Sequence, residues 1–573
     1  MHRRDFLYGA AAAGLAAAAN QFACVSSPLS GIRRRHDLKM TRTGRPNILL
    51  ITTDQERYRL PTSAGFALPQ RERLMAQGLT FRNHHATTAP CTPSRSVMYT
   101  GQHVPHTHMF DNLDFPYVDS MSDKLETLGT MMRAAGYYTA YKGKWHLSGG
   151  LAGSDDGKPK PALADALERF GFSDFSTLGD DHGKPWGGHT LDAGTATDVG
   201  GWLATRGRDV AKQQPWLMVA SFINPHDIMF IDSDGAGAVQ ETRGPFKIRA
   251  APATELYAKD WQPELPASFA DDLSTKPVAQ RDYQTLMNLA VGTMPLDRED
   301  MWRANLNYYL NCLREVDLQI GVVLDALERS GMAANTIVVF TSDHGEMGGA
   351  HGLRQKGPLV YQENVNVPLV IRHPDAIGGT TTDALSSAVD LVPTLLALAG
   401  VNQTLRRAEF PELVGYDVSD LIAHPAGKGP RGDRGLLFTY DALNSVDVGF
   451  WVHIAGLMEQ RVFHGKFINL LHLRPDLRKR GFIRGVFDGR YKLARYFAPT
   501  DYNRPQTFES LLAANDVELY DVATDPHEMT NLARDPLSAK QLLTALNTKL
   551  ENLIASEIGD DTTLSLPRLR VRA

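Results

Sequence analysis

Short hydrophobic runs of strand length recur along the first two thirds of the chain. Residues 46–53, 216–223 and 336–342 are the clearest, and residues 137–141 and 367–371 have a similar character. Runs without polar alternation predict strands that are buried on both faces, as in the centre of a largely parallel sheet covered by helices. We therefore expect one sheet to dominate this part of the molecule.

Helical periodicity separates some of these strands. Residues 301–329 repeat apolar side chains at a spacing of about 3.6, which predicts a long amphipathic helix ended by Gly331. Residues 127–135 and 390–399 predict shorter helices, each followed by a glycine. Because a strand at 336–342 follows the long helix, the two form half of a crossover unit. The predicted class is α/β, with a large mixed, mostly parallel sheet flanked by helices.

The pattern changes after about residue 405. Residues 435–440, 450–457 and 482–497 favour antiparallel strands, and a helix is expected near residues 538–558. Strands followed by a helix in this way are typical of an α+β domain. We therefore predict a catalytic domain over residues 46–404 and a smaller C-terminal α+β domain, an antiparallel sheet plus a helix, over residues 405–573.

Two long segments of the first domain lack a clean hydrophobic period. Residues 149–201 are rich in Gly and Asp and predict a surface excursion, whereas residues 228–298 are mixed in polarity with many prolines. Insertions of this length often cover an active site. We expect substrate specificity to reside in these segments and in the second domain.

The N-terminal segment is set apart from the fold. An arginine pair at positions 3 and 4 precedes an alanine-rich run, which resembles a twin-arginine export signal. The run is too short and too weakly apolar for a stable membrane span. We predict a signal segment over residues 1–25, a linker over 26–45, and a periplasmic or secreted protein. Lipid anchoring at Cys24 is the minor alternative.

Composition narrows the range of functions. The chain has 573 residues, 43% of them hydrophobic, which is enough for a large core and more than one domain. Its net charge of −5 leaves no basic surplus, so nucleic acid is not an expected partner. Three distant cysteines do not make a disulfide framework, and packing in the long predicted helix explains Cys312. Oligomer formation stays open.

Polar residues follow four of the predicted strands. They are Asp54, Lys144 with His146, His226, and Asp343 with His344. A single polar residue after a strand is ordinary, because caps and turns use such residues. Since the carboxyl ends of parallel strands share one crevice, the whole set predicts a binding or catalytic site there.

A short motif lies on a fifth connection. Cys91, Pro93 and Arg95 come directly before a predicted helix that Gly101 ends. This spacing places one sulfur and one guanidinium at a helix N-terminus, where free N–H groups favour anions. From the residues alone, a buried thiol beside a turn is the alternative interpretation.

The spacing C-x-P-x-R resembles the modification signature of the sulfatases, within the alkaline-phosphatase-like superfamily. Residues 136–146 resemble the second signature of that family. Supporting elements are residues 342–345, Lys356, residues 518–521 and residues 525–526. The resemblance covers the chain from residue 46 to about residue 532.

The resemblance implies a nucleophile made from Cys91. In this family a maturation enzyme oxidises the cysteine to formylglycine, whose hydrated aldehyde attacks the sulfur of a sulfate ester. Asp54, Asp343 and His344 would hold one divalent metal together with residue 91. Dividing hydrolysis into two steps through a covalent intermediate is the usual gain of nucleophilic catalysis.

The resemblance also implies roles for the remaining candidates. Arg95 would fix the nucleophile and offset its charge. Lys144 and Lys356 would bind the sulfate oxygens, where charge builds in the transition state. His226, with Lys356 as a second candidate, would give a proton to the departing alcohol, and His146 would assist collapse of the covalent intermediate.

Two positions depart from the common sulfatase pattern. Many sulfatases have adjacent aspartates where this chain has Asp54 and Gln55, and an Asp-Asn pair where it has Asp343 and His344. An imidazole donor shifts metal preference away from Ca²⁺ toward Mn²⁺ or other transition metals. We expect Ca²⁺ on family grounds, with Mn²⁺ as the alternative. The departures resemble the choline-sulfatase and phosphonate-monoester-hydrolase branches.

The predicted function is hydrolysis of sulfate monoesters by an arylsulfatase-like enzyme. The alternative is a phosphonate monoester or phosphate diester hydrolase on the same scaffold, although Lys144 and His146 together favour sulfate. A secreted binding protein with a relic pocket is a third hypothesis, but the cysteine and the metal ligands it would be expected to lose are all present. Aromatic, choline-like and carbohydrate sulfates stay open as substrates.

Overall fold

The computed structural model describes residues 44–115, 117–149, 151, 165–176, 183–234, 241–243, 246–459 and 474–561. The predicted signal segment, most of the predicted linker and Cys24 lie outside the described residues.

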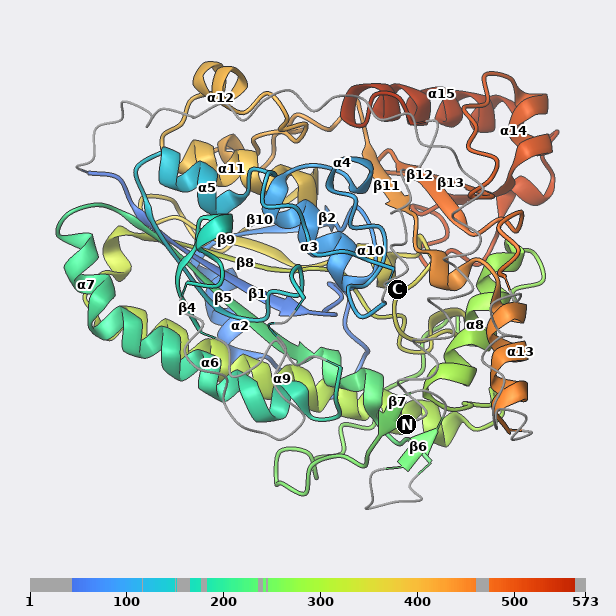
Figure 1. Ribbon diagram of the computed structural model, residues 1–573, viewed down its shortest axis with the longest axis horizontal. Helices are drawn as coiled ribbons and strands as arrows, with labels where there is room; N and C mark the ends of the chain where they lie inside the picture. The colour runs from blue at the N-terminus through green and yellow to red at the C-terminus, as the bar shows by residue number, and fades with distance from the viewer. Residues whose placement is uncertain are drawn as a thin grey trace, which may run out of the picture.

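Eight strands form the central sheet (Figure 1). In order across the sheet they are β10 (Thr380–Ser387), β2 (Leu79–His85), β9 (Leu369–Arg372), β8 (Thr336–Ser342), β1 (Asn47–Asp54), β5 (Trp216–Pro225), β3 (Tyr138–Gly143) and β4 (Ser173–Ser176). Within this sheet, β9 runs antiparallel to both of its neighbours, and the remaining pairs are parallel. The predicted large, mixed, mostly parallel sheet is confirmed.

The central strand β1 divides the core into two layers. Ile48 and Leu50 belong to the hydrophobic cluster on one face of the sheet, and Leu49 and Ile51 belong to the cluster on the other. Every residue of β1 is buried. Side chains of successive strand residues point to opposite faces, so burial on both faces requires the continuous apolar run seen in the sequence.

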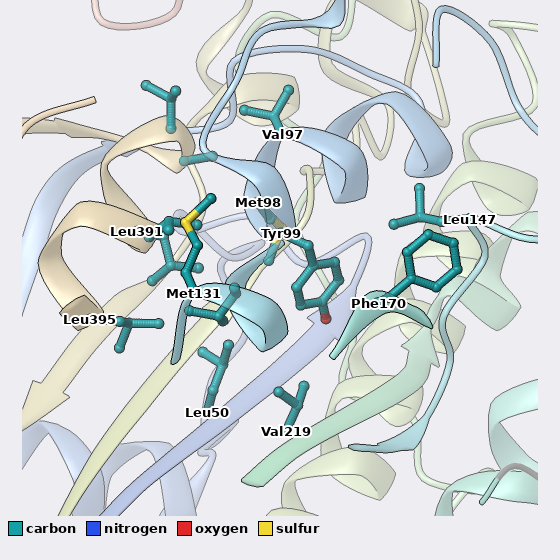
Figure 2. Packing of buried hydrophobic residues seen from close by; sticks show 14 of the residues in the cluster. Leu50, Val97, Met98, Tyr99, Met131, Leu147, Phe170, Val219, Leu391 and Leu395 are labelled. Atoms are coloured by element: carbon teal, nitrogen blue, oxygen red, sulfur yellow. The ribbon is translucent and has the colours of Figure 1, made fainter. Parts of the chain in front are cut away.

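Helices cover both faces of the sheet (Figure 1). One layer contains α2 (Pro69–Gln77), α6 (Gly187–Ala204) and α9 (Glu299–Arg329), and the other contains α3 (Cys91–Thr100), α5 (Leu128–Ala134) and α11 (Leu391–Leu398). The second layer is seen from close by in Figure 2, where side chains of α3, α5 and α11 lie over the strand residues Leu50 and Val219. The long helix predicted over residues 301–329 is confirmed as α9.

A second sheet of four antiparallel strands follows. Its order is β11 (Leu436–Tyr440), β12 (Phe482–Phe487), β13 (Tyr491–Phe497) and β14 (Asp516–Asp521), and α15 (Lys540–Glu557) packs against it. A separate cluster joins Phe438 and Tyr496 of this sheet to Ala89 and Val360 of the first domain. The second sheet therefore packs against the residues just before Cys91 and just after Lys356.

The segment 450–457 is a correction to the sequence prediction. It was expected to be a strand, but it lies within the helix α13 (Val448–Glu459), which contacts α8 (Val278–Val291). Its aromatic and β-branched residues favour strands only weakly, and packing against a second helix outweighs that preference.

The segment 149–201 is a second correction. In place of a surface excursion, its described part contains β4 and most of α6. The buried residues Ala196, Val199 and Leu203 of α6 pack in the layer that α9 also covers. Five of the glycines that suggested a loop lie within α6, and one of them, Gly200, faces α9, where a Cβ atom would lie 3.4 Å from Ala326.

The remaining described elements are short: α4 (Val104–Thr107), α7 (Arg206–Ala211), β6 (Glu241–Arg243), β7 (Phe246–Ile248), α10 (Gln362–Val365), α12 (Gln403–Glu409) and α14 (Phe508–Ala514). Among the described helices, none by itself is long and apolar enough to cross a membrane; the stretch 388–398 together with α12 meets the criteria of length and composition only as a pair bent by 116°.

Candidate active site

The polar residues at the strand ends meet at one edge of the sheet. The strands β8, β1, β5 and β3 lie side by side in that order and run parallel, so their carboxyl ends point the same way. Asp54 ends β1, and Asp343 follows β8 directly. Lys144 follows β3, and His226 follows β5. Adjacency of the strands thus brings these residues together at one edge of the sheet, as the sequence predicts.

Cys91 reaches the same edge from α3. It is the first residue of this ten-residue helix, so its sulfur lies at the positive end of the helix dipole. The backbone N–H of Thr92 donates to Asn112 Oδ1 at 3.1 Å, which satisfies one of the free N–H groups of the first turn. Pro93 and Arg95 follow within the same helix.

Four potential ligands surround one point. One ligand atom from each of Asp54, Cys91, Asp343 and His344 lies within 4.8 Å of the other three, and all four residues are buried. Cys91 Sγ is 3.1 Å from His344 Nε2 and 3.6 Å from Asp54 Oδ1. His344 Nε2 is 3.8 Å from Oδ1 of both aspartates. The four predicted metal-site residues therefore form one cluster.

Arg95 determines which carboxylate oxygens face the cluster. Its Nη2 donates to Asp54 Oδ2 at 3.1 Å and its Nε to Asp343 Oδ2 at 2.9 Å. A third bond runs from Nη1 to the hydroxyl of Ser221 in β5, at 3.1 Å. Each aspartate thus bonds Arg95 through Oδ2, while its Oδ1 atom faces the His344 imidazole. Asp343 Oδ1 also accepts the backbone N–H groups of Gln55 and His344.

The donor set fits a divalent cation. His344 Nδ1 lies 3.0 Å from the carbonyl oxygen of Gly345, so this nitrogen carries a proton, and Nε2 is the ring nitrogen that would bind a cation in the cluster. Two carboxylate oxygens and one imidazole nitrogen are accepted by several divalent metals, and the imidazole favours transition metals over Ca²⁺. The four residues therefore fit a bound divalent cation.

Positive charge dominates the surroundings of residue 91. Burial and Asp54 both raise the pKa of the Cys91 thiol, yet Lys356, Lys144 and His344 outweigh them and hold this pKa well below its usual value. Burial likewise opposes ionisation of Asp54, but Lys144 and its other cationic neighbours hold the pKa of this carboxyl well below its usual value. The site therefore stabilises negative charge at position 91.

The remaining two ligands are shifted in the opposite direction. Burial and the neighbouring Asp54 carboxylate raise the pKa of Asp343 to about 6. Burial disfavours the charged form of His344, but Asp343 and Cys91 outweigh it and raise the pKa of this imidazole to about 8. Both pKa shifts arise in part from negative groups that lie close together, and a bound cation would reduce the repulsion between these groups.

The two predicted lysines occupy different environments. Lys144 Nζ donates to Asp54 Oδ2 at 2.6 Å and forms a buried ion pair with it. Lys356 Nζ donates instead to the side-chain oxygen of Gln55, which is neutral. Both ammonium groups lie within electrostatic range of Cys91.

His226 is buried beside Cys91. Burial, followed by the charges of Lys356 and Lys144, lowers the pKa of His226 to about 3, so the imidazole is neutral at physiological pH. Its Nδ1 atom is buried and has no hydrogen-bond partner among the described residues. A bound group that presents a donor or an acceptor would satisfy this nitrogen.

His146 is placed through its backbone as well as its ring. Its carbonyl oxygen accepts a hydrogen bond from Thr92 Oγ1 at 3.0 Å, which ties this loop to the first turn of α3. Its ring Nε2 lies 3.3 Å from Asp114 Oδ2. The residue is buried and has a φ of 56°, in the left-handed region.

The sequence analysis did not assign a role to four residues of the site: Gln55, Asn112, Ser221 and Glu346. Ser221 contacts Arg95, Asn112 caps the turn of Cys91, and Glu346 contacts Gln55, which contacts Lys356. Ser221 is a polar residue in an otherwise apolar strand, and Glu346 follows the Asp343-His344 pair by two residues. These are the only signals in the sequence, and neither predicts the contact.

Comparison with known proteins assigns the family. The family model described as Sulfatase matches residues 46–401. The chain is 30% identical over 403 residues to the uncharacterized sulfatase YidJ of Escherichia coli (strain K12), covering 67% of this chain and 72% of that protein. It is 28% identical over 408 residues to an N-acetylglucosamine-6-O-sulfatase of Bacteroides thetaiotaomicron, covering 63% and 68%.

Solved structures share the fold. A 2-O GAG sulfatase superposes with a TM-score of 0.63 at 22% identity, covering 89% of this chain and 92% of that chain. The phosphonate monoester hydrolase of Agrobacterium radiobacter gives a TM-score of 0.58 at 21% identity, covering 90% and 96%. The fold is therefore common to enzymes named for two different esters. Because the family model spans most of the first sheet and the signature around Cys91, this chain belongs to the sulfatase family of the alkaline-phosphatase-like superfamily.

Proposed function

We propose that this protein hydrolyses sulfate monoesters with a formylglycine formed from Cys91 and one bound divalent metal. The observation that carries the proposal is the convergence of Cys91 with Asp54, Asp343 and His344 in one buried cluster that Arg95 spans. A thiol with only a packing role would not need two carboxylates, an imidazole and three cationic side chains around it.

The metal would be held by Asp54, Asp343, His344 and residue 91. When bound, it supplies Lewis-acid activation and charge neutralisation at the reacting sulfate. Ca²⁺ is proposed first on family grounds, and Mn²⁺ is the alternative that the imidazole ligand favours. Formylglycine supplies a hydroxyl oxygen as nucleophile, and its aldehyde is restored when sulfate departs.

The cationic residues bind and orient the ester. Arg95 holds the two aspartates in place and balances their charge, since it pairs with both. Lys144 and Lys356 contact the sulfate oxygens, where negative charge grows as the ester bond breaks. Their fixed positions in a buried site make them more effective than the same charges in water, because little reorganisation is needed during the reaction.

His226 moves the proton. At neutral pH its imidazole is unprotonated, because burial and two lysines lower its pKa to about 3. It therefore accepts the proton of the attacking hydroxyl and passes it to the oxygen of the departing alcohol. An imidazolium of such low pKa is a strong acid, which makes the second transfer favourable and the first unfavourable, so acceptance of the proton must be coupled to attack on the sulfate and to its transfer to the departing alcohol. His146 assists collapse of the covalent intermediate in the second step.

The proposed substrate class is a small-molecule or carbohydrate sulfate ester. A relative at 28% identity is named for N-acetylglucosamine 6-O-sulfate, which favours a carbohydrate sulfate over a simple aryl sulfate as the natural substrate. Aryl sulfates then serve as chromogenic probes of the same chemistry. The N-terminal signal leads us to propose export to the periplasm after Cys91 has been modified by a formylglycine-generating enzyme.

Phosphonate monoester or phosphate diester hydrolysis is the second candidate. The pairs Asp54-Gln55 and Asp343-His344 favour it, because they depart from the common sulfatase metal site. The two reactions are separated by comparing kcat/KM for 4-nitrophenyl sulfate and for a 4-nitrophenyl phosphonate monoester. We expect the sulfate to be the better substrate; a phosphonate reaction faster by orders of magnitude would reverse the assignment.

Mass spectrometry of the peptide that contains Cys91 tests the nucleophile directly. In active protein we expect the mass of an aldehyde in place of the thiol. Full activity in protein that contains only unmodified cysteine would exclude the formylglycine mechanism.

A further inference from the structure

Glu346 is a buried carboxylate beside the active site that the proposed mechanism does not use. Its Oε1 accepts the backbone N–H groups of Gly348 at 2.8 Å and Gln355 at 2.7 Å. Its Oε2 accepts from the side-chain nitrogen of Gln55. The residue is 1% exposed. A buried charge satisfied by three N–H donors is held in a fixed position and fixes its donors in return.

Gln55 uses all of its polar groups. Its backbone N–H donates to Asp343 Oδ1 at 3.1 Å, and its backbone carbonyl accepts from Tyr309 at 3.0 Å. In the side chain, the amide nitrogen faces Glu346 and the amide oxygen faces Lys356. Chemistry fixes this orientation, because a carboxylate only accepts and an ammonium group only donates.

We propose that Glu346 is a positioning residue for Lys356 and acts through Gln55. The three side chains form a line of carboxylate, amide and ammonium in which every hydrogen bond points the same way. We name this line the Glu346–Gln55–Lys356 relay. It rests on the proposed function only in that Lys356 binds the anionic group of the ester.

Among the residues that the structure describes, no carboxylate contacts Lys356, so its charge is not cancelled. Lys144 is paired at 2.6 Å with Asp54, whereas the partner of Lys356 is a neutral amide oxygen. Lys356 is therefore positioned without being neutralised, which suits a group that must attract an anion. The negative charge that orients the amide lies one side chain further away, on Glu346.

The relay also explains why a glutamine stands at position 55. A carboxylate there would lie at hydrogen-bond distance from Glu346, and two negative groups at that distance repel each other. It would also neutralise Lys356. Glutamine satisfies both neighbours because it carries a donor and an acceptor on one planar group.

The substitution Glu346→Gln changes one atom and reverses the relay. The new amide keeps its oxygen on the N–H groups of Gly348 and Gln355 and turns its nitrogen toward Gln55. Gln55 must then rotate, and its own nitrogen meets Lys356, donor against donor. We expect KM for 4-nitrophenyl sulfate, and the inhibition constant of inorganic sulfate, to rise about 10-fold, in line with the loss of one charge-assisted hydrogen bond.

A double-mutant cycle separates positioning from general stability. In a Lys356→Ala background, Glu346→Gln should change kcat/KM less than about 2-fold, because the two changes act on one interaction. Effects that multiply in the double variant would overturn the proposal. Glu551→Gln is the matched control: it removes charge from another buried carboxylate, which pairs with Arg495 and Arg504, and should lower stability without changing KM.

The double variant Gln55→Glu with Glu346→Gln tests the charge argument. It restores a continuous line of hydrogen bonds, since the amide at 346 donates to the carboxylate at 55, which accepts from Lys356. We expect its melting temperature to exceed that of Gln55→Glu alone, while KM stays high because Lys356 is neutralised. A double variant with wild-type KM would contradict the need for an uncancelled charge.

Different experimental results would refute the relay and the proposed function. Wild-type protein that hydrolyses neither the sulfate nor the phosphonate ester would refute the proposed function, and the cycle is then run on the binding of inorganic sulfate by calorimetry. An unchanged dissociation constant in Glu346→Gln would refute the relay alone. Wild-type protein that binds no sulfate would refute both.

Discussion

The hydrogen bond from His344 to Gly345 shows how one contact outside the cluster selects the chemistry inside it. It places the proton on Nδ1 and leaves Nε2 as a ligand, 3.1 Å from the Cys91 sulfur. Arg95 acts similarly on the aspartates, because it bonds Oδ2 of each and leaves Oδ1 facing the His344 imidazole. The donor atoms are thus set before any metal arrives, which lowers the cost of ordering them on binding.

Removal of the nucleophile is the simplest test at this scale. We expect Cys91→Ala to lower kcat/KM by more than ~10³-fold, since a covalent mechanism has no substitute for this group. Folding should be little affected, because the deleted sulfur makes few apolar contacts in a polar cluster. Steady-state kinetics and a melting curve of the same preparation measure both; turnover close to wild type would exclude residue 91 as nucleophile.

Asp343→Asn should remove metal and activity together. The substitution keeps the shape of the side chain but removes a charge that the cation requires. Chelation should lower the melting temperature of the wild type, because a ligand that binds only the folded state stabilises it by about 2.7 kcal/mol at 100 times its Kd. The variant should show no such shift.

Metal analysis and melting curves with and without chelator give the readout for Asp343→Asn. Asp317→Asn is the control, since Asp317 is a buried carboxylate that pairs with Arg71 and is not one of the four cluster residues. It should lose stability and keep its metal. A metal content in Asp343→Asn equal to that of the wild type would argue against the assigned ligand set.

At the residue scale, the sequence predicted the groups that carry charge and missed those that orient them. Asp54 and Asp343 follow strands, so position alone made them candidates. Ser221 could not be found in this way, because its contact with Arg95 depends on β1 and β5 being neighbours, with Thr52 opposite Ser221. Register between strands distant in sequence is not encoded in any local pattern.

At the scale of elements, the ends of β3 and β5 approach each other closely where they deliver the site residues. Gly143, with a φ of 95°, ends β3, and a Cβ atom there would lie 2.0 Å from the carbonyl oxygen of Ser221. The next residue, Lys144, donates its backbone N–H to the same oxygen at 2.9 Å. The absence of a side chain at position 143 thus allows the backbone of Lys144 to bond Ser221, the residue that also bonds Arg95.

Gly143→Ala should therefore impair both stability and catalysis. The left-handed backbone alone costs an alanine roughly 1–2 kcal/mol, and the clash with Ser221 adds to this. Because the strand end must shift, we expect kcat/KM to fall by about 10-fold or more as Lys144 moves. Gly331→Ala isolates the first effect, since Gly331 has a φ of 75° with no atom within 4 Å of its Cβ position.

Chemical denaturation and kinetics of the two glycine variants form the comparison. Gly331→Ala should lose stability modestly and keep wild-type kinetics. Equal losses of stability in both variants, with unchanged kcat/KM at Gly143→Ala, would mean that the close approach of β3 and β5 has no consequence for the site.

Elements defined by a strong period were predicted, and elements stabilised by their neighbours were not. The helix α9 shows a continuous apolar stripe. The predicted helix starts two residues after the observed start and ends at the same residue, Arg329. The helix α6 is built largely from Gly, Ala and Thr, which give no such stripe, and packing against α9 and β5 stabilises it. Tertiary contacts of this kind cannot be inferred from one segment alone.

At the scale of the whole molecule, the buried residue Arg431 links a helix that packs on the first sheet, α11, to a helix that packs on the second, α15. Arg431 pairs with Asp390, which precedes α11, and with Glu557 at the end of α15. Glu557 also contacts His103, which follows α3 by three residues. The predicted boundary at residue 405 separates Asp390 from Arg431, so this ion cluster crosses it. Removing one partner of such a buried cluster leaves the other charges uncompensated.

The cluster makes stability depend on pH in a defined direction. Burial opposes ionisation of Glu557, but Arg431 and His103 outweigh it and lower its pKa to about 2, against 4.5 for an ordinary glutamate. A depressed pKa contributes stability that is complete above about pH 4.5 and is lost as pH falls toward 2. Lowering this pKa from 4.5 to about 2 corresponds to about 3 kcal/mol of stability.

We therefore expect Glu557→Gln to be less stable than the wild type by about 3 kcal/mol at pH 7, with a gap that stays constant down to about pH 5 and narrows below pH 4.5. Urea denaturation of both proteins at several pH values measures the gap. Glu299→Gln is the control, because Glu299 lies exposed on α9 and its pair with Arg303 is worth little. A stability difference that is absent at pH 7, or that stays constant down to pH 3, would show that the cluster does not stabilise the charged form of Glu557.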